Sequence, residues 1–308
     1  MKLIFIHHFL GKVDSILKNW NEEFKDSFPI TEELFNTKII DSKYTLINES
    51  ICLFENKDYV GTIIFKALDD DLYISFVHIT KEKRFKGYGK LLINKAIELA
   101  KKYNYKKIIL GSDPDCLFSG VFMEGNDEVH RFFSNQGFTR EYLNYNLIAY
   151  KPPEPIWLDD EYKIKKAEET NEVELLSFIE NNFSSRWLKE VKENTLEQVY
   201  LLFYKNRIIG FINSAISKNH HYPNSLNLYE LFENLAGIGP LGIAPEFQSL
   251  GLGKGFVNFV IRDLFRLGAS EVMVDWTGLI EFYKKCGFNK IYKTYIIYSM
   301  KVGKENEE

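Results

Sequence analysis

The stretch that decides the fold runs from Leu241 to Gly255 and reads LGIAPEFQSLGLGKG. An apolar run is followed by a polar turn, and closely spaced glycines then open an amphipathic segment over 256–267. Apolar residues recur in that segment at helical spacing, so we predict a strand, a turn and a helix. Free amides at a helix start, together with the positive end of the helix dipole, form an anion site. Glycines let a diphosphate approach such a turn closely.

The same pattern occurs earlier in the chain, over residues 79–92, which read ITKEKRFKGYGKLL. Three pairs of equivalent positions share one offset of 164 residues (243 − 79, 248 − 84 and 253 − 89). A constant offset across strand, turn and helix indicates an internal duplication.

The duplication continues downstream of both turns. Residues 107–111 and 271–275 are predicted strands. The segments RFFSNQGF (131–138) and EFYKKCGF (281–288) are each predicted to be a short helix that ends at a glycine. Alternating, tyrosine-rich strand patterns close both halves.

Two motifs in each half resemble those of the GNAT family of acyl-CoA N-acyltransferases. They are [Arg/Gln]-x-x-Gly-x-Gly at the turn and aromatic-x-x-x-Gly-Phe downstream. The resemblance covers nearly the whole chain, once per half. It implies an α+β fold of two tandem GNAT domains, each a mixed, mostly antiparallel sheet flanked by helices. It also implies acetyl-CoA as co-substrate and the primary amine of a small molecule as acceptor, by direct attack in a ternary complex.

The length of 308 residues is sufficient for two domains with separate cores. We place the first domain at 1–150, a proline-rich linker at 151–156 and the second domain at 157–308, because KPPEP can continue neither a helix nor a central strand. The first half has 14 more residues than the second between its turn and its Gly-Phe pair (137 − 89 = 48; 287 − 253 = 34). These extra residues fall in the irregular stretch 113–126, which we expect to be functional or ordering.

Binding residues for acetyl-CoA follow from the resemblance. Amides from Ser249 to Gly255 are expected to take the diphosphate, and the strand before them is expected to pair with the pantetheine arm. The candidates in the second half are Leu241, Ile243, Gln248, Ser249, Leu250, Gly251, Leu252, Gly253, Lys254 and Gly255. Those in the first half are Ile79, Arg84, Gly87 and Gly89.

Proton transfer separates the halves. The family's usual acid is a tyrosine four residues before the glycine of Gly-Phe, which is Tyr283 in the second half and Phe133 in the first. Phenylalanine cannot donate a proton, so we expect a catalytic second domain and a degenerate first one. The alternative for Tyr283 is an amphipathic core tyrosine.

The general base is less defined. Asp275, at the end of the predicted strand, is our candidate; it could instead cap the next helix. Glu230 and Glu233 are rivals on the insertion 217–237. His220–His221 lie in the same insertion but have no carboxylate at ligand spacing, so we expect no metal site.

The composition excludes several classes. A net charge of −4 provides no basic field for nucleic acid, which also disfavours an aminoacyl-tRNA-dependent transferase. No apolar run reaches the length of a membrane span, and the three cysteines fit no disulfide framework. We expect a cytoplasmic monomer or homodimer. The main alternative function is a non-catalytic acyl-CoA-binding or sensing module.

Overall fold

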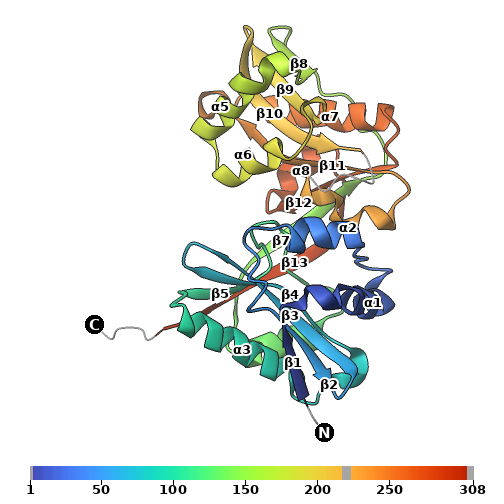
Figure 1. The fold of residues 1–308 in the computed structure, drawn as a ribbon. Helices are drawn as coiled ribbons and strands as arrows, with labels where there is room; N and C mark the ends of the chain where they lie inside the picture. Colours follow the sequence, from blue (N-terminus) through green and yellow to red (C-terminus); the bar gives the residue numbers. More distant parts are fainter. Residues whose placement is uncertain (1–2, 217–222, 304–308) are drawn as a thin grey trace. The chain divides into compact units, whose positions relative to one another are not determined.

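A computed structural model describes residues 3–216 and 223–303. The chain forms two compact units (Figure 1). The first comprises the residues up to Asn144 together with those from Thr294 onward, and the second comprises Tyr145–Lys293.

The first unit contains a sheet in the order β1-β2-β3-β4-β5-β13, with the short strand β6 paired to β13. Only the β4–β5 pair is parallel among these neighbours, as expected for a mixed sheet. Its elements are β1 (Leu3–His7), η1 (Phe9–Lys12), α1 (Val13–Phe24), α2 (Glu32–Phe35), the π-turn η2 (Asn36–Ile40), β2 (Ile51–Glu55), β3 (Asp58–Leu68), β4 (Asp71–Ile79), η3 (Lys81–Lys83), α3 (Tyr88–Lys102), β5 (Lys107–Leu110), β6 (Val121–Phe122) and α4 (Asp127–Asn135).

The second unit repeats this plan in the order β7-β12-β11-β10-β9-β8, with β11 and β12 parallel. Its elements are β7 (Thr139–Ala149), β8 (Tyr162–Lys166), η4 (Glu169–Asn171), α5 (Glu172–Asn182), α6 (Ser185–Lys192), η5 (Leu196–Gln198), β9 (Val199–Tyr204), β10 (Arg207–Ala215), the 3-10 helix η6 (Asn224–Leu231), β11 (Leu235–Ile243), η7 (Pro245–Phe247), α7 (Leu252–Arg266), β12 (Glu271–Thr277), α8 (Ile280–Cys286) and β13 (Lys290–Lys301).

Helices cover both faces of each sheet (Figure 1). In the first unit the apolar stripe of α3 packs on one face, and Trp20 of α1 packs on Phe76 of β4 on the other. In the second unit α7 covers one face, while α5 and α6 cover the opposite face. These apolar stripes supply the burial that stabilises each sandwich of helix and sheet.

The units differ from the predicted domains at their last strands. Residues 294–301 of β13 pair with β5 and complete the first sheet, whereas the sequence placed them in the second domain. Residues 145–149 of β7 pair with β12 and complete the second sheet. Each half therefore gives its final strand to the other. Both strands have the same alternating pattern, so residue pattern alone does not select the partner.

The predicted linker is not a free spacer. Residues 151–158 form no helix or strand, but they pack on the second unit. Asn258 of α7 accepts a hydrogen bond from the Ile156 amide (2.9 Å) and donates one to the Glu154 carbonyl (2.9 Å). Pro153 lies against Gly287, where a methyl group would come within 2.6 Å of it.

The parallel strands separate in both units at equivalent positions. In the first unit the last parallel pair is Ile74–Leu110, and in the second it is Ile238–Val274. In each case the longer strand continues for five more residues (79 − 74; 243 − 238) without pairing to its parallel neighbour. The second-half divergence, which the GNAT resemblance predicted, is present.

Candidate functional site

The glycine turn opens each long helix in the same way. Gly251 has φ = 81° and precedes α7; Gly87 has φ = 86° and precedes α3. These left-handed conformations favour glycine, and no side chain caps either helix. A methyl group added at either glycine would meet no atom within 4 Å. Both turns therefore present uncapped helix starts to open space, which suits an anion.

The [Arg/Gln] position has a structural task that the sequence did not reveal. Gln248 donates from Nε2 to the Ile243 carbonyl (2.9 Å), and Arg84 donates from Nε to the Ile79 carbonyl (3.0 Å). Each side chain thereby ties the turn to the end of its strand. Arg84 also forms an ion pair with Glu23 of α1 (2.6 Å).

The two turns differ in charge and shape. The first contains exposed Lys81, Lys86 and Lys90, whereas Lys254 is the corresponding cation near the second. Ser249 and its equivalent Phe85 both have positive φ, 65° and 60°. The Phe85 side chain is 88% exposed.

The remaining candidates in the second turn fall into three environments. Leu241 and Ile243 lie on the part of β11 beyond the divergence, and exposed Leu250 lies at the tip of the turn. Leu252 is buried in the α7 core. The Phe282 ring contacts the position of a Gly253 methyl (3.4 Å), and in the first unit Phe132 does the same at Gly89 (3.0 Å). Gly255 lies under Leu158, which leaves 2.5 Å for a methyl, so packing alone explains this glycine.

Tyr283 lies on α8, where only 6% of its surface is exposed. Its ring packs edge-on against Phe282 and Phe288. Its hydroxyl has no hydrogen-bond partner among the residues that the structure describes. Burial raises the pKa of Tyr283 well above its ordinary value, and the nearby Cys286 thiol and Asp275 carboxylate raise it further. The phenol is therefore held in the protonated form that an acid needs.

Asp275 follows Val274, the last residue of β12 that pairs with β11. Its Oδ1 lies 4.0 Å from the position that a methyl group on Gly239 would occupy, so the carboxylate is at the divergence of the strands. The start of α8 is held by Thr277, whose hydroxyl accepts from the Leu279 amide (3.0 Å). Capping thus falls to Thr277 rather than Asp275. The rivals Glu230 and Glu233 are both exposed.

The opposite, α6 side of the divergence contains residues that the sequence did not single out. Arg186 of α6 stacks over the Trp276 ring with its guanidinium carbon 3.6 Å from the ring centroid. Its Nε donates to buried Glu190 (2.8 Å), which also accepts from Asn224 of η6 (3.3 Å). Trp276 has φ = 45°, a strained conformation of a kind that clusters at functional sites. Nothing in the residue spacing signals this arrangement.

The corresponding side of the first unit is filled by its own chain. Phe118, from the extra loop, packs against Trp20 (5.4 Å between ring centroids), Phe28 (4.6 Å) and Phe76 (6.2 Å). Gly111 is the equivalent of Asp275 (275 − 164). The first unit therefore has neither the tyrosine nor the carboxylate, and aromatic rings cover its α1 side.

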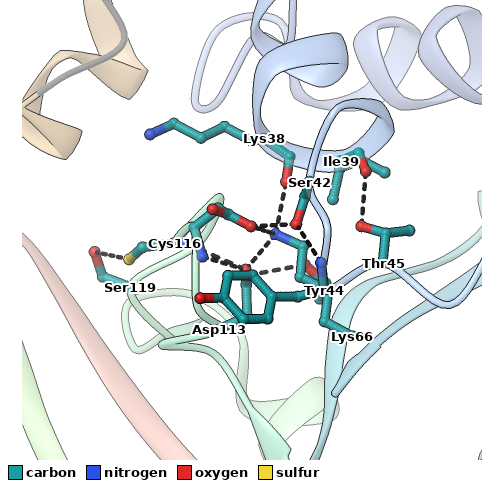
Figure 2. A network of polar contacts seen from close by, with 11 residues as sticks. Lys38, Ile39, Ser42, Tyr44, Thr45, Lys66, Asp113, Cys116 and Ser119 are labelled. Carbon is teal, nitrogen blue, oxygen red and sulfur yellow. Dashed lines mark hydrogen bonds and ion pairs between the residues drawn. The ribbon is translucent and has the colours of Figure 1, made fainter. Parts of the chain in front are cut away.

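A buried polar network holds that extra loop in place, as Figure 2 shows. Lys66 of β3 donates to the carboxylates of Asp113 (2.5 Å) and Asp115 (3.1 Å), and all three side chains are at most 2% exposed. Lys66 also donates to the Lys38 carbonyl (2.6 Å). Ser75 of β4 donates to the second oxygen of Asp113 (2.8 Å), which connects the loop to β4. The extra residues are thus an ordered part of the core.

Other candidates from the sequence have simple outcomes. His220 and His221 lie outside the described residues. Among the described residues there is no group of three or more His, Cys, Asp or Glu that could hold a metal ion. No described helix is long and apolar enough to cross a membrane. Cys52, Cys116 and Cys286 are all buried free thiols.

With the geometry in place, the comparisons agree on the fold class: two acyl-CoA N-acyltransferase folds in one chain. A family profile described as "Acetyltransferase (GNAT) family" matches twice, at residues 14–138 and 157–288. The chain therefore belongs to the GNAT family and is a tandem GNAT acyltransferase. No curated protein matched the sequence significantly.

Solved structures with the same fold include multidomain and tandem proteins. A fungal structure described as a "GCN5-related glucosamine N-acetyltransferase region" in a GH3 β-N-acetylglucosaminidase aligns with TM-score 0.83 and 21% identity; the alignment covers 97% of this chain and 38% of that longer one. A GCN5-related N-acetyltransferase from Sphaerobacter thermophilus aligns with TM-score 0.68 and 13% identity (98% and 96% covered). A tandem GNAT protein from the clavulanic acid pathway aligns with TM-score 0.64 and 12% identity (99% and 100% covered).

Proposed function

We propose that the second unit transfers the acetyl group of acetyl-CoA to the primary amine of a small molecule. The observation that supports this most is the asymmetry of the two halves. Tyr283 and Asp275 lie near one another beside the divergent strands of the second unit, while the first has Phe133 and Gly111 at those positions.

The proposed reaction is a direct attack. The amine nitrogen bonds to the thioester carbon, the C–S bond breaks, and the departing thiolate takes the proton of the Tyr283 hydroxyl. Asp275 receives the proton that the attacking amine loses, directly or through water. The helix start at Gly251 holds the diphosphate, and the free edge of β11 from Gly239 to Ile243 aligns the pantetheine arm.

The acceptor belongs to the amino sugars, amino acid derivatives or polyamines. The fungal structure with the same fold is described as a glucosamine N-acetyltransferase region, so D-glucosamine is the first amine to test. Its low identity to this chain makes that a choice of starting substrate rather than an assignment.

The test is release of free CoA thiol from acetyl-CoA with a panel of amines. We expect Tyr283→Phe to lower kcat by about 100-fold or more, with little change in the KM for acetyl-CoA. Gly251→Glu places a carboxylate at the proposed diphosphate site and is expected to abolish turnover. Its matched control is Gly87→Glu, the equivalent change in the first unit, which is expected to leave turnover intact. Full activity of Gly251→Glu would refute the assignment of the site.

A second candidate function concerns the first unit alone. Its turn has the same open geometry and three exposed lysines, which favours a non-catalytic acyl-CoA-binding module there. Native mass spectrometry with acetyl-CoA counts the ligands per chain. Two ligands, of which one is lost on Gly87→Glu, would support this role; one ligand, lost only on Gly251→Glu, would reject it.

A further inference from the structure

One buried amide in the second unit has a donor that the protein does not use. Asn213 lies on β10 and its side chain is completely buried. Its Oδ1 accepts a hydrogen bond from Asn194 Nδ2 (2.6 Å), but its own Nδ2 has no partner among the described residues. Exchanging the amide nitrogen and oxygen does not help, because it would bring two NH₂ groups to 2.6 Å. A buried, unpaired donor is costly and calls for a bound partner.

The position of Asn213 along the sheet is that of the proposed chemistry. The next residue, Ser214, pairs with Ile238, and Ile238 belongs to the last parallel pair before β11 and β12 diverge. Asn213 is therefore level with the opening of the divergence. Asn194, which binds its Oδ1, follows α6, so the amide is on the α6 side of the sheet. This is the side on which Arg186 meets Trp276.

The first unit provides an internal comparison. Sheet register makes Ile64 the equivalent of Asn213, since Gly61–Ile79 and Gly210–Ile243 are equivalent pairs. Ile64 is completely buried, and its partner Phe76 packs against Phe118 of the extra loop. The half whose acceptor side is filled by aromatic rings thus has an apolar residue here, and the half proposed to be catalytic has an amide.

We propose that Asn213 is a specificity-determining residue whose Nδ2 donates a hydrogen bond to a hydroxyl oxygen of the acceptor. The acceptor is then a hydroxylated amine of the amino-sugar class, an inference that rests on the proposed function. The neighbouring charges agree with this class. The Arg186 guanidinium is engaged by Glu190 and Trp276 rather than held for a substrate carboxylate. A polyamine has no oxygen to accept the Asn213 hydrogen bond.

The test compares two amines of similar size, D-glucosamine and cyclohexylamine, which has no hydroxyl groups. Asn213→Asp keeps an oxygen for Asn194 and the side-chain shape but removes the donor. We expect kcat/KM for glucosamine to fall about tenfold or more, and that for cyclohexylamine to change less than twofold. The KM for acetyl-CoA should stay the same. Asn206→Asp, on an exposed turn of the same unit, controls for the added charge.

Each outcome decides the question. Equal losses with both amines would mean that Asn213 has a structural role only, and would overturn the inference while the proposed function stands. Unchanged kinetics would mean that an ordered water satisfies Nδ2, with the same consequence. No wild-type turnover with either amine, or with polyamines and amino acid derivatives, would overturn the proposed function and this inference with it. If Asn213→Asp does not fold, Asn213→Ile, which copies the first unit, serves with the same pair of amines.

Discussion

Replacing Lys66 with methionine tests whether the buried network fixes the extra loop of the first unit. Methionine retains most of the side-chain volume and removes the cation. The change would leave the carboxylates of Asp113 and Asp115 buried without the ammonium that contacts both, and would also remove the bond to the Lys38 carbonyl. Removing one member of a buried ion pair costs about 3–5 kcal/mol, because the remaining charge stays desolvated.

The matched control is Lys106→Met. Lys106 also pairs with an aspartate, Asp70, but both side chains are more than 60% exposed, and such pairs contribute about 1 kcal/mol or less. Urea unfolding followed by circular dichroism measures both changes. Peptide-resolved hydrogen exchange separates the units, and we expect faster exchange in 111–126 for Lys66→Met alone. A loss below about 1 kcal/mol for Lys66→Met, equal to the control, would refute the assigned role.

Three further predictions concern single residues. The pKa of Tyr283 is raised above its ordinary value of 10.0, so the phenol stays protonated; kcat should rise with pH as the amine deprotonates and show no alkaline fall up to about pH 9.5, whereas a fall near pH 8 would contradict its role as the acid. Burial raises the pKa of the Cys286 thiol to about 12, so iodoacetamide at pH 8 should modify it only after unfolding, as peptide mass mapping would show. Gly61→Ala would put a methyl group 2.3 Å from the His78 carbonyl oxygen and should destabilise by about 1–3 kcal/mol in urea, whereas Gly11→Ala, with open space around it, should change stability by less than about 0.5 kcal/mol.

The features that sequence pattern predicted are local or repeated. The turn at Gly251 is encoded within a few residues, because its left-handed conformation needs glycine and the helix after it has an apolar stripe. The offset of 164 residues then predicted the same turn at Gly87. The asymmetry between Tyr283 and Phe133 was equally visible, because it depends on one position relative to one glycine.

Features that depend on distant contacts were not predictable in this way. Lys66 and Asp113 are 47 residues apart, and nothing in either local sequence shows that they meet in the core. The left-handed conformation of Trp276 is set by its surroundings, since tryptophan has no preference for it. The orphan donor of Asn213 depends on a side chain from a separate helix–strand connection, so its composition alone looks ordinary.

The exchange of final strands has a consequence for the order of synthesis. Tyr298 of β13 pairs with Leu110 of β5, a separation of 188 residues (298 − 110). At about 5–20 residues per second, a ribosome needs roughly 10 to 40 s to make that intervening chain. For that interval the outer edge of β5 lacks its native neighbour, and unpaired strand edges attract other strands. The nascent first half must therefore wait, incomplete, for the strand that closes it.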